Sequence, residues 1–159
     1  MNTRFGLCFS LLLMLLSCTS PTDLDAVRSE EKATYDPSQD FEAIKAVMSM
    51  QEVAWSAGDL EQFMTGYIND ESLTFIGSRG LSYGWETTLA NYKKGYPNTA
   101  AMGKLSFEVL ELKSLSPEYC YMIGKFYLTR DAEDLSGYFT LLWQKIEGEW
   151  KVIADQTCG

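Results

Sequence analysis

The apolar residues of this 159-residue chain change their spacing at Pro97, and that change limits the folds open to it. Before Pro97 they recur at steps of three and four residues, which indicates amphipathic helices. After Pro97 they alternate with polar residues, which indicates strands with one buried face. Helices first and a sheet last predict an α+β domain, in which the sheet packs its apolar face against the helices.

Three helices and a short strand are expected before Pro97. The first helix starts at Phe41 and ends at Gly58, which can adopt the left-handed conformation common after a helix. Asp59 and Gln62 resemble a capping box that opens a second helix, which extends to the Asn69-Asp70 pair. A β-rich run over 72–76 and a turn over 77–80 follow, and the third helix spans 84–95.

Four strands are expected after Pro97, over residues 105–115, 119–129, 136–146 and 149–157. Tight turns separate them, including the two-residue hairpin signal Glu147-Gly148. Such a meander is antiparallel, and it must curve strongly to enclose three helices.

The N-terminal residues have the features of a bacterial lipoprotein signal. Arg4 precedes an apolar run over 7–16 that is too short to span a bilayer, and Leu15-Leu16-Ser17-Cys18 matches the cleavage site before an acylated cysteine. We therefore expect residues 1–17 to be a signal peptide, residues 18–39 to be lipidated Cys18 with a polar linker, and residues 40–159 to be the folded domain. This places the protein on a membrane of the cell envelope, facing the periplasm or the exterior.

Composition excludes several functions. The chain has 13 basic and 22 acidic residues, a net charge of −9, which argues against binding nucleic acid. It has no histidine, so mechanisms that need a histidine base or metal ligand are excluded. Asp131, Glu133 and Asp134 lack the spacing of a calcium loop. We expect no metal and no cofactor.

Two cysteines, Cys120 and Cys158, belong to the predicted domain. A disulfide between them is permitted outside the cytoplasm and would join the last strand to a neighbour. Two separate thiols are the other interpretation, because spacing alone does not establish the geometry of a disulfide.

Several short motifs, in order, resemble the SnoaL-like branch of the nuclear transport factor 2-like superfamily. They are Trp55-Ser56-Ala57-Gly58-Asp59-Leu60, Tyr67, Phe75-Ile76-Gly77, Gly84-Trp85, Gly124 and the segment from Gly148 to Thr157. The resemblance covers residue 40 to the C-terminus. It implies a cone in which a curved sheet wraps helices around an interior pocket, and a homodimer formed through the outer face of the sheet. The same cone serves enzymes and binding proteins, so the resemblance does not choose between them.

The last strand departs from that family at one position. Many relatives end Asp-His-Thr-Ser, where this chain has Asp155-Gln156-Thr157-Cys158. Glutamine can orient a ligand through hydrogen bonds but cannot exchange a proton at neutral pH. Regular alternation places Gln156 on one face with Trp150 and Val152, and Asp155 on the other, so only one of the two faces the interior.

Asp155 is the best candidate for an acid or base, because an apolar pocket raises the pKa of a carboxyl group, as it does in ketosteroid isomerase, a member of the superfamily that this chain resembles. Tyr67 and Tyr92 are the candidate hydrogen-bond donors to a developing oxyanion. Structural interpretations compete with each: Asp155 as an acceptor for nearby groups such as Thr157, and Tyr92 as core.

The candidate pocket wall comprises Trp55, Phe75, Trp143 and Gln156, and the three aromatic residues could equally be plain core.

Two functions remain open. The first, which we favour because histidine and a second placed carboxylate are missing, is a non-catalytic domain that binds a small apolar ligand or a protein partner. The second is an enzyme of the isomerase, dehydratase or cyclase kind that uses Asp155 with Tyr67 or Tyr92.

Overall fold

The computed structural model describes residues 35–159. The predicted signal peptide, lipidated Cys18 and most of the predicted linker lie outside the described residues. Within residues 35–159 no helix is long and apolar enough to cross a membrane. Residues Asp36–Gly159 form one compact unit.

Helix α2 (Ser38–Ala57) is the long helix that the apolar spacing predicts. Gly58 ends it in the left-handed conformation, with φ of 82°. Asp59 then opens α3 (Leu60–Met64), because its Oδ1 accepts a hydrogen bond from Gln62 N at 2.9 Å. Helix α3 is shorter than predicted: Tyr67 lies beyond it and forms a parallel β-bridge with Val152.

The buried stripe of α2 contains two polar residues. Asp40, Ile44, Met48, Gln51 and Trp55 recur at steps of three and four and are all buried. Near the start of the helix, Asp40 Oδ1 accepts hydrogen bonds from two strand residues, Lys145 Nζ at 2.7 Å and Trp150 Nε1 at 2.9 Å. These bonds fix the start of α2 to the sheet.

Helix α4 (Trp85–Gly95) confirms the third predicted helix. A short helix that the sequence did not predict, α5 (Thr99–Met102), follows it, and Asn98 caps α5 by accepting a hydrogen bond from Ala101 N at 2.9 Å. The carbonyl of Met102 accepts a hydrogen bond from Trp55 Nε1 at 3.0 Å, so α5 holds the indole of α2 in one orientation.

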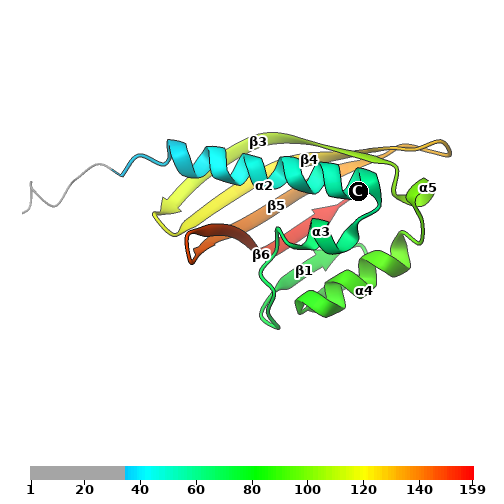
Figure 1. Ribbon diagram of the computed structural model, residues 1–159, viewed down its shortest axis with the longest axis horizontal. Helices are drawn as coiled ribbons and strands as arrows, with labels where there is room; N and C mark the ends of the chain where they lie inside the picture. Colours follow the sequence, from blue (N-terminus) through cyan, green and yellow to red (C-terminus); the bar gives the residue numbers. More distant parts are fainter. Residues whose placement is uncertain (1–34) are drawn as a thin grey trace, which may run out of the picture. The chain divides into compact units, whose positions relative to one another are not determined.

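The four C-terminal strands match the prediction to within a residue or two at each end. They are β3 (Lys104–Ser116), β4 (Tyr119–Thr129), β5 (Leu135–Ile146) and β6 (Glu149–Cys158), and consecutive strands pair antiparallel. Figure 1 shows the curved sheet with α2 lying along it and α4 beyond β1. The α+β cone predicted from the sequence is thus confirmed.

The sheet extends further than predicted at its β6 edge. Strand β1 (Thr74–Gly77) pairs parallel with β6, and β2 (Gly80–Tyr83) pairs antiparallel with β1, which gives the order β2-β1-β6-β5-β4-β3. Strand β2 was not predicted because it has four residues, three of them exposed. The sheet is therefore antiparallel except for the β1–β6 pair.

A β-bulge in β6 determines which side chains face the interior. Leu142 pairs with Ala154 and Trp143 with Val152, so Ile153 is an extra residue in the ladder. The bulge breaks the regular alternation assumed from the sequence. As a result Asp155 is buried like Val152 and Trp150, although alternation assigns Asp155 to the opposite face.

Candidate functional site

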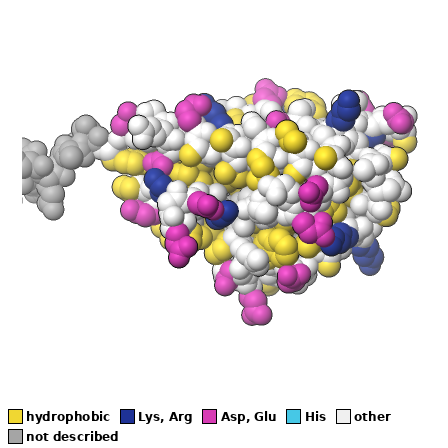
Figure 2. All heavy atoms as spheres, viewed as in Figure 1, with side chains coloured by type: hydrophobic (Ala, Val, Ile, Leu, Met, Phe, Trp, Pro, Cys, Tyr) yellow, Lys and Arg dark blue, Asp and Glu magenta, His cyan; other side chains and the backbone are white. Residues whose placement is uncertain are grey.

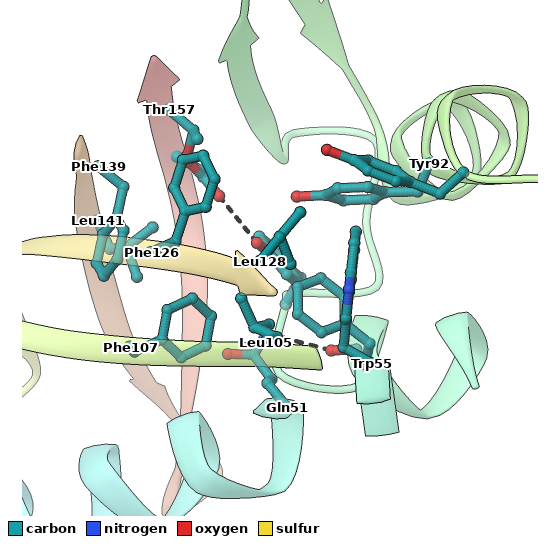
Figure 3. A pocket seen from close by; sticks show the side chains of 14 residues that line it. Gln51, Trp55, Tyr92, Leu105, Phe107, Phe126, Leu128, Phe139, Leu141 and Thr157 are labelled. Carbon is teal, nitrogen blue, oxygen red and sulfur yellow. Dashed lines mark hydrogen bonds between the residues drawn. The ribbon is translucent and has the colours of Figure 1, made fainter. Parts of the chain in front are cut away.

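A cavity of about 80 Å³ lies between the inner face of the sheet and the helices. Strands β3 to β6 supply one wall, and α2, α3 and α4 supply the other (Figure 3). Most of the lining is apolar or aromatic. The lining residues are Gln51, Trp55, Phe63, Tyr67, Tyr92, Tyr96, Leu105, Phe107, Phe126, Leu128, Phe139, Leu141, Asp155 and Thr157.

The carboxyl group of Asp155 is the one acidic group of this lining, and two hydroxyl groups hold it. Tyr67 Oη donates a hydrogen bond to Oδ2 at 2.8 Å, and Thr157 Oγ1 donates one to Oδ1 at 2.6 Å. The bridge between Tyr67 and Val152 explains how Tyr67 reaches β6 although it follows α3 in the chain.

Burial changes the pKa values of Asp155, Tyr67 and Tyr92. It raises the pKa of Asp155 from its ordinary value of 3.8 to about 6, against the opposing effect of the bonds from Thr157 and Tyr67. Burial, and then the charge of Asp155, raise the pKa of Tyr67 well above 10, and Tyr92 is affected in the same way. The hydrogen-bonding interaction between the two tyrosines raises the pKa of Tyr67 further and lowers that of Tyr92, against the larger effect of burial. The three groups therefore form one connected array.

Trp55 is the centre of the aromatic wall. Its ring meets Phe63, Tyr92 and Tyr96 edge to face, with centroids 5.1, 5.6 and 4.7 Å away. Such contacts hold aromatic rings in defined orientations. The wall is therefore shaped before any ligand enters, which reduces the entropic cost of binding.

Gln51 is a further polar residue of the cavity and was missed by sequence reasoning. It is 2% exposed, and its Nε2 donates a hydrogen bond to the Phe63 carbonyl at 3.2 Å. A signal was present in the sequence, because Gln51 interrupts the apolar stripe of α2 between Met48 and Trp55.

The structure brings together four of the seven predicted catalytic and pocket residues: Asp155, Tyr67, Tyr92 and Trp55. The other three do not line the cavity. Phe75 contacts Tyr92 edge to face, at 5.6 Å between ring centroids. Trp143 is fully buried in the core, and its Nε1 has no hydrogen-bond partner in residues 35–159. Gln156 is exposed on the outer face, because the bulge directs Asp155 inward in its place.

Cys120 and Cys158 are separate thiols, the first buried and the second exposed. Cys120 pairs with Trp143 and Cys158 with Tyr138, five residues apart along β5. That separation is about 17 Å at the rise of a strand, too far for a disulfide. The structure therefore agrees with the interpretation of Cys120 and Cys158 as two separate thiols and not with a disulfide.

A strongly curved sheet closed by helices around an aromatic cavity with one buried carboxyl defines a cone-shaped α+β pocket protein. The chain shares 36% identity with an NTF-2-like protein of unknown function from Shewanella oneidensis MR-1; the match covers 75% of this chain and 98% of that one, with a TM-score of 0.72. This protein therefore belongs to the NTF-2-like (nuclear transport factor 2-like) family.

Two more distant structures share the fold alone. A ketosteroid isomerase-like protein from Erwinia carotovora atroseptica SCRI1043 is 15% identical, with coverage of 74% of this chain and 93% of that one and a TM-score of 0.59. A putative calcium/calmodulin-dependent protein kinase type II association domain from Thiobacillus denitrificans ATCC 25259 is 14% identical, with coverage of 72% and 92% and a TM-score of 0.62. Neither a protein-family model nor a curated protein matches the sequence.

Proposed function

We propose that this protein is a lipoprotein of the bacterial cell envelope whose domain, a SnoaL-like member of the family, binds a small apolar molecule inside the cone. The observation that carries the binding function is the preshaped aromatic cavity with a single acidic group. The cavity volume of about 80 Å³ is about half the roughly 150 Å³ of an engineered apolar cavity that binds benzene, so the cavity encloses part of a single-ring ligand and the rest of the ligand lies at its opening.

Three features favour binding over catalysis. Tyr67 donates its hydroxyl proton to Asp155, so it is not available to an oxyanion while that carboxyl is ionised. The lining contains one carboxyl group, so a second acid or base would have to come from elsewhere. The chain has no histidine to serve in that role.

Native mass spectrometry of the protein purified gently from its own host tests the binding function. We expect a retained small molecule, released when the protein unfolds. Leu141→Phe adds a ring at the cavity wall and should abolish retention, whereas Leu142→Phe, the neighbouring change on the other face of β5, should not. Equal retention by both variants would place the molecule outside the cavity.

The alternative is an isomerase, dehydratase or cyclase type of enzyme that uses Asp155 with Tyr67 or Tyr92. The observation that favours it is the pKa of Asp155, raised by burial to about 6, which suits a general base near neutral pH. A rate that follows this pKa and is lost in a folded Asp155→Asn variant would establish the enzyme. A rate unchanged by that substitution would remove Asp155 from the mechanism.

The lipid anchor is proposed from the sequence around Cys18. Metabolic labelling with palmitate in the host should label the protein, and Cys18→Ser should abolish the label and release the protein from the membrane fraction. Labelling that survives the substitution would exclude Cys18 as the acylation site.

We also propose that the domain forms a homodimer through the outer face of the sheet. Several apolar side chains from different strands are exposed there: Ile76, Leu81, Tyr83 and Tyr138. Tyr119→Arg or Tyr121→Arg would place a charge on that face and should halve the mass measured by light scattering. Val53→Arg, at an exposed position of α2, is the matched control. A mass that neither tyrosine substitution changes would exclude this face as the interface.

A further inference from the structure

The side-chain oxygen of Gln51 is an unused hydrogen-bond acceptor inside the cavity. Because Nε2 donates to the Phe63 carbonyl, the amide must be oriented with Oε1 turned away from that carbonyl. Figure 3 shows Gln51 reaching from α2 into the cavity. Oε1 accepts no hydrogen bond from residues 35–159, although the residue is only 2% exposed.

The charged group that the cavity offers to a ligand is an acceptor. This group is the carboxyl of Asp155, and the hydroxyl groups of Tyr67 and Thr157 already donate their protons to it. The hydroxyl groups of Tyr92 and Tyr96 also belong to the lining, and each can donate as well as accept a hydrogen bond. The lining contains no lysine or arginine. An anionic ligand would therefore meet a carboxylate without a compensating cation.

An acceptor in an apolar site is costly to leave unpaired, so a ligand that donates to it is selected over one that does not. Gln51 projects from α2, while Asp155 belongs to β6 on the opposite wall. A ring between these walls would contact the aromatic side chains and present a hydroxyl to α2.

We propose that Gln51 Oε1 accepts a hydrogen bond from the ligand, and that the ligand is an uncharged, single-ring alcohol or phenol. This inference rests on the proposed function, namely that the cavity binds a small apolar molecule. It adds the specificity: the ligand is a hydrogen-bond donor and not an anion. Gln51 is then the residue that distinguishes a hydroxyl-bearing ring from the same ring without one.

The test compares phenol, anisole, toluene and benzoate by ligand-observed NMR titration of the full-length chain. Phenol and anisole differ in the donor proton, and toluene lacks the oxygen. We expect phenol to bind roughly three- to tenfold more tightly than anisole or toluene, the range for one net hydrogen bond. We expect benzoate to bind more weakly than toluene, because of Asp155.

The variant Gln51→Met keeps the length of the side chain and removes its amide. It should weaken phenol binding to the level of toluene and leave toluene within about twofold of its wild-type affinity. If the preference for phenol persists in Gln51→Met, the hydroxyl binds elsewhere, with Asp155 the remaining acceptor, and the inference is overturned.

The ligand series on the wild-type chain decides the inference even if Gln51→Met fails to fold. Equal binding of phenol, anisole and toluene overturns the inference but supports the proposed function, because the cavity is then an apolar site without donor specificity. Binding by none of the four compounds refutes both. A preference for benzoate would overturn the inference that the ligand is uncharged, but it would support the proposed function, because the cavity would still bind a small ring.

Discussion

Asp155→Asn should stabilise this protein at neutral pH and leave it almost unchanged in acid. Folding buries the carboxyl of Asp155 and raises its pKa from 3.8 to about 6. The folded state therefore holds the proton more tightly, so the cost of the buried charge is absent below about pH 4. It grows as pH rises from about 4 to 6 and is constant above that range. The two pKa values differ by about 2, which corresponds to about 3 kcal/mol.

Asparagine is nearly isosteric and carries no charge at any pH. We expect the free energy of unfolding of Asp155→Asn to exceed that of the wild type by up to about 3 kcal/mol at pH 8, and by little at pH 4. Urea unfolding at a series of pH values measures the difference, in which the other titrating groups cancel. Asp70→Asn is the control of opposite sign, because hydrogen bonds from Ser72 lower the pKa of Asp70. A difference for Asp155→Asn that does not change between pH 4 and 8 would refute the reasoning.

Three other outcomes are expected. Gly124→Ala would place a methyl group against the Phe139 ring, closer than van der Waals contact, and should lower the free energy of unfolding by about 1–3 kcal/mol in chemical denaturation. Asp59→Ala removes the cap of α3 and should cost about 1 kcal/mol by the same measurement; no change would mean that the cap contributes nothing. Maleimide should label Cys158 in the folded protein and Cys120 only after unfolding. Cys120 is buried, and burial raises the pKa of its thiol to about 11, so little reactive thiolate is present. Slow labelling of both cysteines would indicate a disulfide.

Long periodic segments were predictable because the order of apolar and polar residues within each segment shows which face is buried. The first helix and the four long strands each bury one face over ten residues or more, so their periods stand out. Strand β2 has four residues and a largely exposed pattern, and its partner is set by tertiary pairing. The parallel pairing of β1 with β6 joins segments about eighty residues apart, which no local pattern reveals.

The candidate site was predictable in its residue types but only partly in its geometry. Trp55, Tyr67 and Asp155 line the cavity, and the family resemblance pointed to each of these regions. Trp143 and Gln156 do not line it, for different reasons. Trp143 lies on the inner face but deeper in the core, and depth along a strand is not encoded in alternation. Gln156 faces outward because of a bulge that alternation could not anticipate.

The bulge at Ile153 has a consequence for how proteins of this shape are compared. It offsets the last strand by one residue, so the two neighbouring side chains at 155 and 156 exchange faces relative to a strand without it. A gapless alignment of β6 between a bulged and an unbulged protein would then equate a residue inside the cone with one on its outer surface. Function transferred along such an alignment would be assigned to the wrong side of the sheet, so equivalence at this strand has to be established from superposed backbones.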